Sequence, residues 1–153
     1  MREELGRQLE LIDYNKVEFV WIVDFPFYEK NEDTNQIEFA HNPFTMPQGG
    51  MEALNTQNPE DIVAYQYDCV CNGYEMLSGA VRNHDPEIMV KAFELAGYKK
   101  EDVESKFAGL YNAFSFGAPP HAGGAFGFDR MLMPIMETDN IRDVITFPFT
   151  KNG

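Results

Sequence analysis

The chain has 153 residues, 44% of them hydrophobic, which is enough to bury one sizeable core and indicates a single domain over residues 1–153. Its 25 Asp and Glu against 12 Lys and Arg give a formal net charge of -13. A field of this sign repels polyanions, which argues against a module that binds nucleic acid through its own surface charge.

The sequence shows neither a signal peptide nor an apolar run of membrane-spanning length, so we expect a soluble, cytoplasmic protein with no membrane partner. Cys69 and Cys71 lie two positions apart in an apolar run, where they share a strand face but are poorly placed to bridge each other. We expect buried, reduced thiols, which fit the cytoplasm. The Cys-x-Cys pair is a weak pattern for a metal site, because the chain has no further cysteine and its histidines are scattered.

The amino-terminal third predicts a helix and two strands. Residues 2–12 carry leucine and isoleucine at helical spacing, which indicates a short amphipathic helix or a frayed leader. Residues 17–23 are almost entirely apolar, as in a strand covered on both faces. After a polar, turn-like stretch over 29–36, residues 37–40 predict a short partner strand.

The middle of the chain predicts an ordered loop and a hairpin. Residues 41–50 contain two prolines and two glycines, which restrict the loop, and such loops often carry function. Asn58-Pro59 begins a short turn, and residues 62–71 follow as a strand. Asn72-Gly73 fits a two-residue hairpin turn, and residues 74–82 form the returning strand.

Two helices are predicted next. Asp85 and Pro86 supply a cap and a first-turn proline, and Gly97 supplies a stop, so a helix is expected from Pro86 to Ala96. A second helix over residues 100–114 places its apolar residues on one stripe. Near the end of the chain, residues 139–145 indicate another short helix, followed by extended residues.

A glycine-rich run follows the stiff linker at residues 117–121. Gly123, Ala125 and Gly127 occupy alternate positions, so on an extended strand they share a face almost without side chains. A flat ligand fits such a face. The alternative is that the glycines only admit a neighbouring backbone.

The other residues of this run complete the pattern. Phe126 and Phe128 would point the opposite way into a core, and Asp129 would cap the following turn. Arg130 would emerge beside the bare face, where a planar guanidinium suits a polyphosphate or a purine.

This order of small residues, glycine, acid and arginine before an apolar helix resembles motif 3 of the class II aminoacyl-tRNA synthetases, over about residues 117–136, where that family binds ATP. Other segments resemble the bacterial aspartyl-tRNA synthetases in the same order and spacing. They are residues 23–26, 41–45, 72–75, 79–85, 117–130 and 140–148. The resemblance covers nearly the whole chain. It implies an α+β fold, an antiparallel sheet flanked by helices, as the C-terminal portion of the class II catalytic domain.

The resemblance also implies residue roles. Arg82 would grip the side-chain carboxylate of L-aspartate through paired hydrogen bonds, and His41 would contact the same amino acid. Taken alone, Arg82 reads as a strand-end arginine in a surface ion pair and His41 as a loop histidine bound to backbone.

The nucleotide roles implied by the resemblance fall later in the chain. Glu75 would be an acid of the ATP site and a possible Mg²⁺ ligand; taken alone, it is an ordinary solvated acid. The residues with nucleotide contacts would be Gly127, Phe128, Asp129 and Arg130.

The implied activity is that of an aspartate–tRNA ligase: ATP activates L-aspartate, and the aspartyl group is then transferred to tRNA. This chemistry rests on positioning and charge neutralisation, so we assign no catalytic acid or base. The full-length enzyme is expected to be a homodimer.

The sequence departs from the family pattern in three places. Asn42 stands where the family usually has a second histidine, the glycine-rich run before Arg82 is thinned, and Pro134 falls inside the helix after Arg130, which it should kink or shorten. We find no counterpart of motif 1, of motif 2 or of the anticodon-binding barrel, so the isolated chain is expected to be inactive.

Two other functions remain open. One is a stand-alone binding or assembly module derived from a synthetase, and the other is an amide ligase that uses aspartate on a related fold. The sequence does not decide whether the tRNA partner is that for aspartate alone or also that for asparagine.

The spacing of Glu75 and Arg82 predicts a β-bulge. Residues seven positions apart point to opposite faces of a regular strand, whereas the implied roles need both at one site. One extra residue in the ladder, expected at Ser78-Gly79, would bring them to the same face. Alternatively, Glu75 reaches the nucleotide from the hairpin end.

Overall fold

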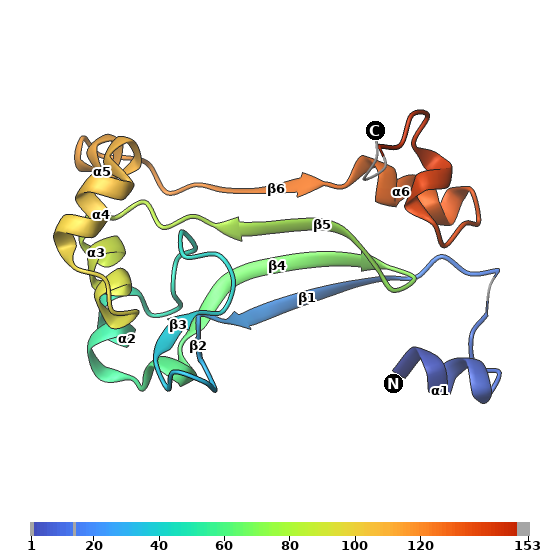
Figure 1. Cartoon of the computed structure of the whole chain (residues 1–153), viewed down its shortest axis with the longest axis horizontal. Helices are drawn as coiled ribbons and strands as arrows, with labels where there is room; N and C mark the ends of the chain where they lie inside the picture. The colour runs from blue at the N-terminus through green and yellow to red at the C-terminus, as the bar shows by residue number, and fades with distance from the viewer. Residues whose placement is uncertain (1, 14, 150–153) are drawn as a thin grey trace.

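The computed structural model describes residues 2–13 and 15–149 and has the predicted α+β fold (Figure 1). Within these residues a four-stranded antiparallel sheet has the order β1-β4-β5-β6, and a separate hairpin pairs β2 with β3. The strands are β1 (Phe19–Pro26), β2 (Tyr28–Lys30), β3 (Ile37–Phe39), β4 (Val63–Cys71), β5 (Tyr74–Val81) and β6 (Ala122–Phe126). The helices are α1 (Arg2–Gln8), α2 (Gly50–Thr56), α3 (Pro86–Leu95), α4 (Lys100–Lys106), α5 (Ala108–Ser115) and α6 (Phe128–Ile135), with short 3-10 turns η1 (Pro59–Asp61) and η2 (Ile141–Val144).

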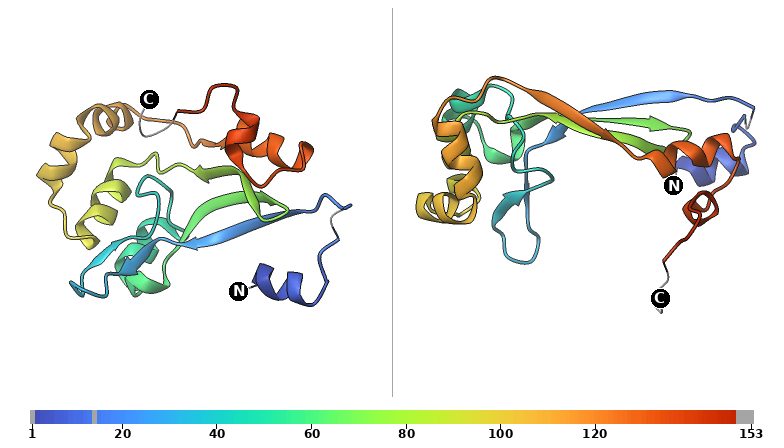
Figure 2. Two further views of the ribbon diagram at one scale, coloured as in Figure 1. Left: turned by 45° about the vertical axis from the view of Figure 1, so that its right-hand side comes forward. Right: turned by 90° about the horizontal axis from the view of Figure 1, so that it is seen from above.

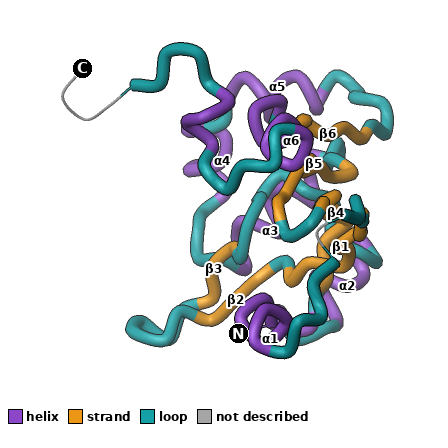
Figure 3. Tube along the Cα trace, turned by 90° about the vertical axis from the view of Figure 1, so that its right-hand side faces the viewer, coloured by secondary structure: helices purple, strands orange, loops and turns teal. Residues whose placement is uncertain are grey.

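The helices gather at the two ends of the sheet. Helices α2 to α5 lie with the β2-β3 hairpin at one end, and α6 with η2 lies at the other (Figure 1). Seen from above, the hairpin, the α4-α5 pair and the segment after α6 project to the same side of the sheet (Figure 2). Along the strands, α6 lies on the β6 side and α1 on the β1 side (Figure 3). Among the described residues, no helical layer covers the middle of the sheet.

The core lies at the end that carries α2 to α5. One cluster joins the hairpin and the start of β4 to α2 and α3; its members are Phe27, Tyr28, Leu54, Ile62, Ala64 and Ala92. A second cluster, Met89, Phe93 and Val103, joins α3 to α4. The Tyr28 hydroxyl donates to the Ala92 carbonyl at 2.8 Å, and burial raises the pKa of this tyrosine. The hairpin is thereby fixed to α3.

β1 is a strand as predicted, but the prediction that both of its faces are covered is wrong. Residues 19–23 are all apolar, and their side chains are 45% to 66% exposed. The reason is position: β1 pairs only with β4, at the edge of the sheet, and no described element packs over it. An apolar run identifies a strand, but it does not say what covers that strand.

The predicted helix at 86–96 is confirmed as α3. The Asp85 carboxylate accepts from the backbone N–H of Glu87 at 2.8 Å and of Ile88 at 3.2 Å, and Gly97 adopts φ +84° after the last turn. The single helix expected over 100–114 is instead two helices, because Phe107 leaves the helical conformation (φ −118°, ψ 28°). The expected apolar stripe still packs against the second cluster.

Other local predictions are confirmed with shorter bounds. The hairpin turn has φ +47° at Asn72 and +89° at Gly73. Both cysteines are free thiols, but only Cys71 is buried, which raises its pKa, and Cys69 is half-buried. The amino-terminal helix ends at Gln8, and the helix expected over 139–145 is the 3-10 turn η2. No helix in the described part of the chain is long and apolar enough to cross a membrane.

Candidate functional site

A cavity of about 350 Å³ opens where β5 ends, between the loop at residues 42–48, β4 and β6. Its lining residues are Asn42, Gln66, Ser78, Gly79, Ala80, Arg82, Gly123, Gly124 and Ala125. Arg82 is the one charged residue among them. The sequence predicted Arg82 for the amino acid and the face of Gly123 and Ala125 for a flat ligand, and the structure brings these three residues to one cavity.

The loop at residues 42–48 is wedged between the ends of β4 and β5. Met46 N–H donates to the Val81 carbonyl at 2.9 Å, and Gln48 N–H donates to the Val63 carbonyl at 2.8 Å. The loop thus hydrogen-bonds to both strands beyond the point where they stop pairing with each other. This is why a loop rich in proline and glycine is well ordered beside the cavity.

The backbone of Arg82 is fixed by hydrogen bonds, whereas its side chain makes no ion pair with another described residue. Its N–H donates to the His121 carbonyl at 2.9 Å, and on its other side it bridges to Thr45. Its side chain is exposed and, within the described residues, its guanidinium makes no ion pair. The interpretation of Arg82 as a member of a surface ion pair is therefore wrong.

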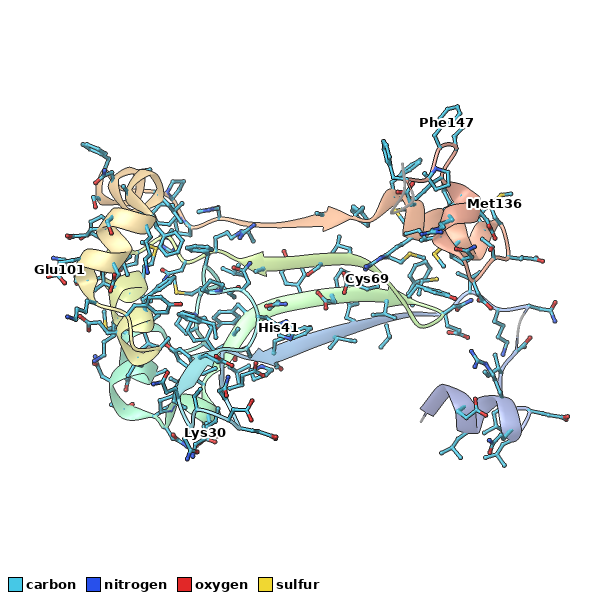
Figure 4. All side chains as sticks on the ribbon, viewed as in Figure 1. Lys30, His41, Cys69, Glu101, Met136 and Phe147 are labelled. Carbon is cyan, nitrogen blue, oxygen red and sulfur yellow. The ribbon has the colours of Figure 1, made fainter. Side chains whose placement is uncertain are left out.

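His41 lies at the margin of the cavity rather than in its lining. The imidazole packs edge-on against the Phe25 ring, with ring centroids 5.4 Å apart, near the carboxyl end of β1 (Figure 4). Its neighbour Asn42 lines the cavity and accepts from the Phe44 N–H at 3.0 Å through Oδ1. The predicted contact of His41 with the amino acid stays a prediction.

On the reverse side of the sheet, Tyr67 packs where β5 and β6 pair. The Tyr67 hydroxyl donates to the Gly123 carbonyl at 3.1 Å, and the Tyr67 ring occupies the space that a Cβ at Gly79 would take. That Cβ would also lie 2.6 Å from the Gly123 carbonyl oxygen. Gly79 therefore has to be glycine for β5 and β6 to approach, whereas Gly123 faces open space. The two interpretations of the glycines therefore both apply: Gly79 allows a close approach of the neighbouring backbone, and Gly123 leaves a face open to a ligand.

Three expectations for the end of this run are wrong. Phe126 and Phe128 are 66% and 71% exposed rather than in a core. Phe126 lies on β6, the other edge strand of the sheet, and Phe128 is the first residue of α6. The cap position of α6 is Gly127, so Asp129 lies inside the first turn and does not cap it. α6 ends one residue after Pro134, which agrees with the expected shortening.

Glu75 and Arg130 meet at a second hollow. Arg130 Nη1 donates to Glu75 Oε1 at 3.1 Å and to the Glu75 carbonyl at 3.3 Å, with both side chains about half exposed. Both line a cavity of about 470 Å³ between the β4-β5 turn, α6 and η2. The other predicted nucleotide residues, Gly127, Phe128 and Asp129, line neither cavity. Glu75 and Arg82 do not share a cavity in this structure.

The predicted bulge is present, although at a different residue. Cys69 pairs with Leu77 and Val70 pairs with Glu75, so the extra residue is Met76. The register places Glu75 on the same face as Arg82, as expected of a shift by one. The position at Ser78-Gly79 was wrong because those residues pair regularly with both neighbouring strands.

The sequence analysis missed Asp68. It pairs across the sheet with Ser78, is 9% exposed, and its Oδ1 is buried without a hydrogen-bond partner in the described structure. An unpaired buried carboxylate is costly, so it points to a missing partner. The signal was available: Asp68 is an acid inside an otherwise apolar stretch of a predicted strand.

Residues 2–151 match the family of class II tRNA synthetases for D, K and N. The chain belongs to this family. The synthetase chain is 59% identical, over all its 153 residues, to the Aspartate–tRNA(Asp/Asn) ligase of Acidiphilium cryptum and covers 26% of that protein. It is 57% identical over its full length to the Aspartate–tRNA ligase of Streptomyces avermitilis and again covers 26%. The resemblance to aspartyl-tRNA synthetases is confirmed.

Solved structures agree on the fold. The aspartyl-tRNA synthetase of Entamoeba histolytica superposes with a TM-score of 0.65 at 27% identity, over 98% of this chain and 26% of that one. The asparaginyl-tRNA synthetase of Pyrococcus horikoshii gives a TM-score of 0.60 at 17% identity, over 88% and 27% of the two chains, and shows the fold alone. The chain spans about a quarter of the length of the relatives it matches.

Proposed function

We propose that this chain is part of an aspartate–tRNA ligase, an enzyme that activates L-aspartate with ATP and transfers it to tRNA. The observation that carries the proposal is the unpaired guanidinium of Arg82 in the first cavity. In a chain with a net charge of -13, an arginine without an acidic partner is available for an anion. Its planar, paired donors suit the side-chain carboxylate of aspartate.

The shape and polarity of the cavity support this ligand. About 350 Å³ is within the range of small-molecule sites, and its polar side chains, Asn42, Gln66 and Ser78, are neutral. None of the residues in its lining carries a carboxylate that would repel the ligand. His41 contributes from the margin, beside Asn42.

We assign the nucleotide to the end of the sheet where β5 begins. There Arg130 would exchange Glu75 for a phosphate or purine of ATP, and Gly127, Phe128 and Asp129 would contact the nucleotide from the start of α6. A half-exposed ion pair contributes little to stability, so this exchange costs little.

Glu75 and Asp68, two acids on the face of the sheet that carries Arg82, suit Mg²⁺. Glu75 is an exposed carboxylate, and Asp68 has the unpartnered buried oxygen. Carboxylate oxygens are the protein ligands that Mg²⁺ takes when phosphates and water complete its shell, and a bound ion would neutralise phosphate charge. The chain's own residues would hold the ion and orient the nucleotide.

The partners of the proposed enzyme are L-aspartate, ATP and tRNA, with a homodimer as its assembly and the cytoplasm as its location. The strongly acidic charge of these residues implies that parts of such an enzyme outside them supply the basic surface for tRNA. The alternative is a binding or assembly module without ligase activity.

Substitution of Arg82 by lysine tests the aspartate site. The charge stays but the paired hydrogen bonds are lost, so we expect L-aspartate to bind the isotope-labelled chain at least about tenfold more weakly in an NMR titration. The matched control is Arg142→Lys, an exposed arginine in η2 that lines neither cavity. Equal affinity of Arg82→Lys and the unmodified chain would remove Arg82 from the site.

A further inference from the structure

Asn42 presents free hydrogen-bond donors to the cavity that holds Arg82. Its Oδ1 accepts from the Phe44 N–H at 3.0 Å, which fixes which way the amide points. Its Nδ2 carries two hydrogens and, within the described residues, donates to no protein acceptor. Turning the amide over would cost the bond to Phe44. The nitrogen is therefore the atom that is free for a ligand.

The backbone around Asn42 is as fixed as that of Arg82. The Thr45 N–H donates to the Asn42 carbonyl at 3.2 Å, which closes a tight turn, and Thr45 is fully buried. Thr45 bridges to Arg82, and the Asn83 N–H donates to the Phe44 carbonyl at 2.8 Å. These bonds place the turn of Asn42 directly against the strand end that carries Arg82.

The donors around the cavity are matched to an acceptor-only ligand group. Arg82 has donors and no acceptor, and the free part of Asn42 is also a donor. A carboxylate accepts from both. The amide of asparagine has one acceptor and one donor atom, so its NH₂ group would face one of these donors with no bond made.

We propose that Asn42 Nδ2 is the second donor, beside Arg82, to the side-chain carboxylate of L-aspartate, and that it helps the site to distinguish aspartate from asparagine. This inference rests on the proposed aspartate site. It gives a positive role to the residue that stands where the family usually has a second histidine.

Asn42→Asp tests this donor, because it removes Nδ2 and keeps the acceptor oxygen. The new carboxylate is isosteric and still accepts from the Phe44 N–H, but it replaces the two hydrogens of Nδ2 with a negatively charged oxygen. We expect the Kd for L-aspartate to rise about tenfold or more, because a bond to a charged group is lost and repulsion replaces it. The side-chain NH₂ of L-asparagine can donate to this new carboxylate, so the preference for aspartate over asparagine should fall by a similar factor.

The measurement is an NMR titration of the isotope-labelled full chain with each amino acid. The control is Asn31→Asp, because Asn31 Oδ1 also accepts from backbone N–H groups in a turn, at 3.0 Å from both Asp33 and Thr34, and Asn31 does not line the cavity. Unlike Asn42, Asn31 also donates from Nδ2, to Glu38 Oε1 at 3.0 Å, so this change loses that bond as well, outside the cavity lining. That variant should keep both affinities. If Asn42→Asp does not fold, Asn42→Ser keeps a short acceptor for the turn, and its hydroxyl is too short to replace Nδ2. It should shift the ratio of affinities in the same direction.

The outcomes separate this inference from the proposed function. Unchanged aspartate affinity in Asn42→Asp, with loss in Arg82→Lys, overturns the role of Asn42 and leaves the aspartate site standing. Equal weakening of both ligands also overturns it, since the residue would then only support the fold. No aspartate binding by the unmodified chain, or no effect of Arg82→Lys, overturns the aspartate site and this inference together.

Discussion

Gly79 and Gly123 lie on the two strands that flank the cavity, yet a methyl group at each should act differently. At Gly79 the methyl would collide with the Tyr67 ring and lie 2.6 Å from the Gly123 carbonyl oxygen, whereas at Gly123 it would meet nothing within 4 Å. We expect Gly79→Ala to lower the free energy of unfolding by about 1 to 3 kcal/mol through overpacking. Urea denaturation measures this change.

Gly123→Ala is the complementary experiment. Its stability in urea should equal that of the unmodified chain, but its methyl enters the cavity, so L-aspartate or ATP should bind more weakly in an NMR titration. If Gly123→Ala loses as much stability as Gly79→Ala, the space in front of Gly123 is filled and the face of β6 is not free for a ligand. If Gly123→Ala binds both ligands normally, the bare face has no role in binding.

For single residues, the sequence predicted the open face left by glycine and alanine better than it predicted how larger side chains pack. The alternation of Gly123 and Ala125 was enough to predict a bare face. No local pattern predicts that Tyr67 fills the space behind Gly79, because the two residues are twelve positions apart and meet only through strand pairing. Asp68 does carry a local signal, because it is an acid among apolar neighbours on its strand.

The cap of α3 gives a prediction at the scale of one element. Asp85→Ala removes both acceptor contacts to the first turn, so we expect a loss of about 1 kcal/mol in the free energy of unfolding, seen as a lower Tm. Asp85→Asn keeps an acceptor oxygen and should lose less. A Tm for Asp85→Ala equal to that of the unmodified chain would mean that α3 is held by its packing alone.

The exposed edge strand β1 should make the chain associate with itself. Unpaired backbone groups beside apolar side chains are a template for pairing, so we expect concentration-dependent association in analytical ultracentrifugation. Val20→Lys, on β1, should shift the average mass toward the monomer. Asn55→Lys adds the same charge on α2, away from this edge, and should not. An equal effect of both substitutions would assign the change to net charge rather than to the strand.

Elements whose signals are local were predicted well, and elements that depend on neighbours were not. Asp85, Pro86 and Gly97 specify α3 by themselves, and Asn72-Gly73 specifies its turn. The break at Phe107 and the exposure of β1 follow from how distant parts pack, which periodicity does not encode.

For the whole molecule, we expect no measurable aspartyl-adenylate from the isolated chain. The sequence has no counterpart of motif 2, and charge arranged around the α-phosphate is the main source of catalysis in such a reaction. The measurement is pyrophosphate exchange that depends on both aspartate and ATP, with a full-length aspartate–tRNA ligase as the positive control. Clear exchange by the purified chain would show that these residues suffice for activation.

The wedged loop and the strands around the cavity also set an order of events at the ribosome. A polypeptide emerges from its amino end, so the loop at 42–48 and the β4-β5 hairpin leave the exit tunnel before β6 exists. Until His121 emerges, the backbone of Arg82 lacks its partner, and until residues 123–125 emerge the cavity lacks a wall. A nascent chain that stops at Pro120 therefore contains both proposed aspartate donors but has no enclosed place to hold the amino acid.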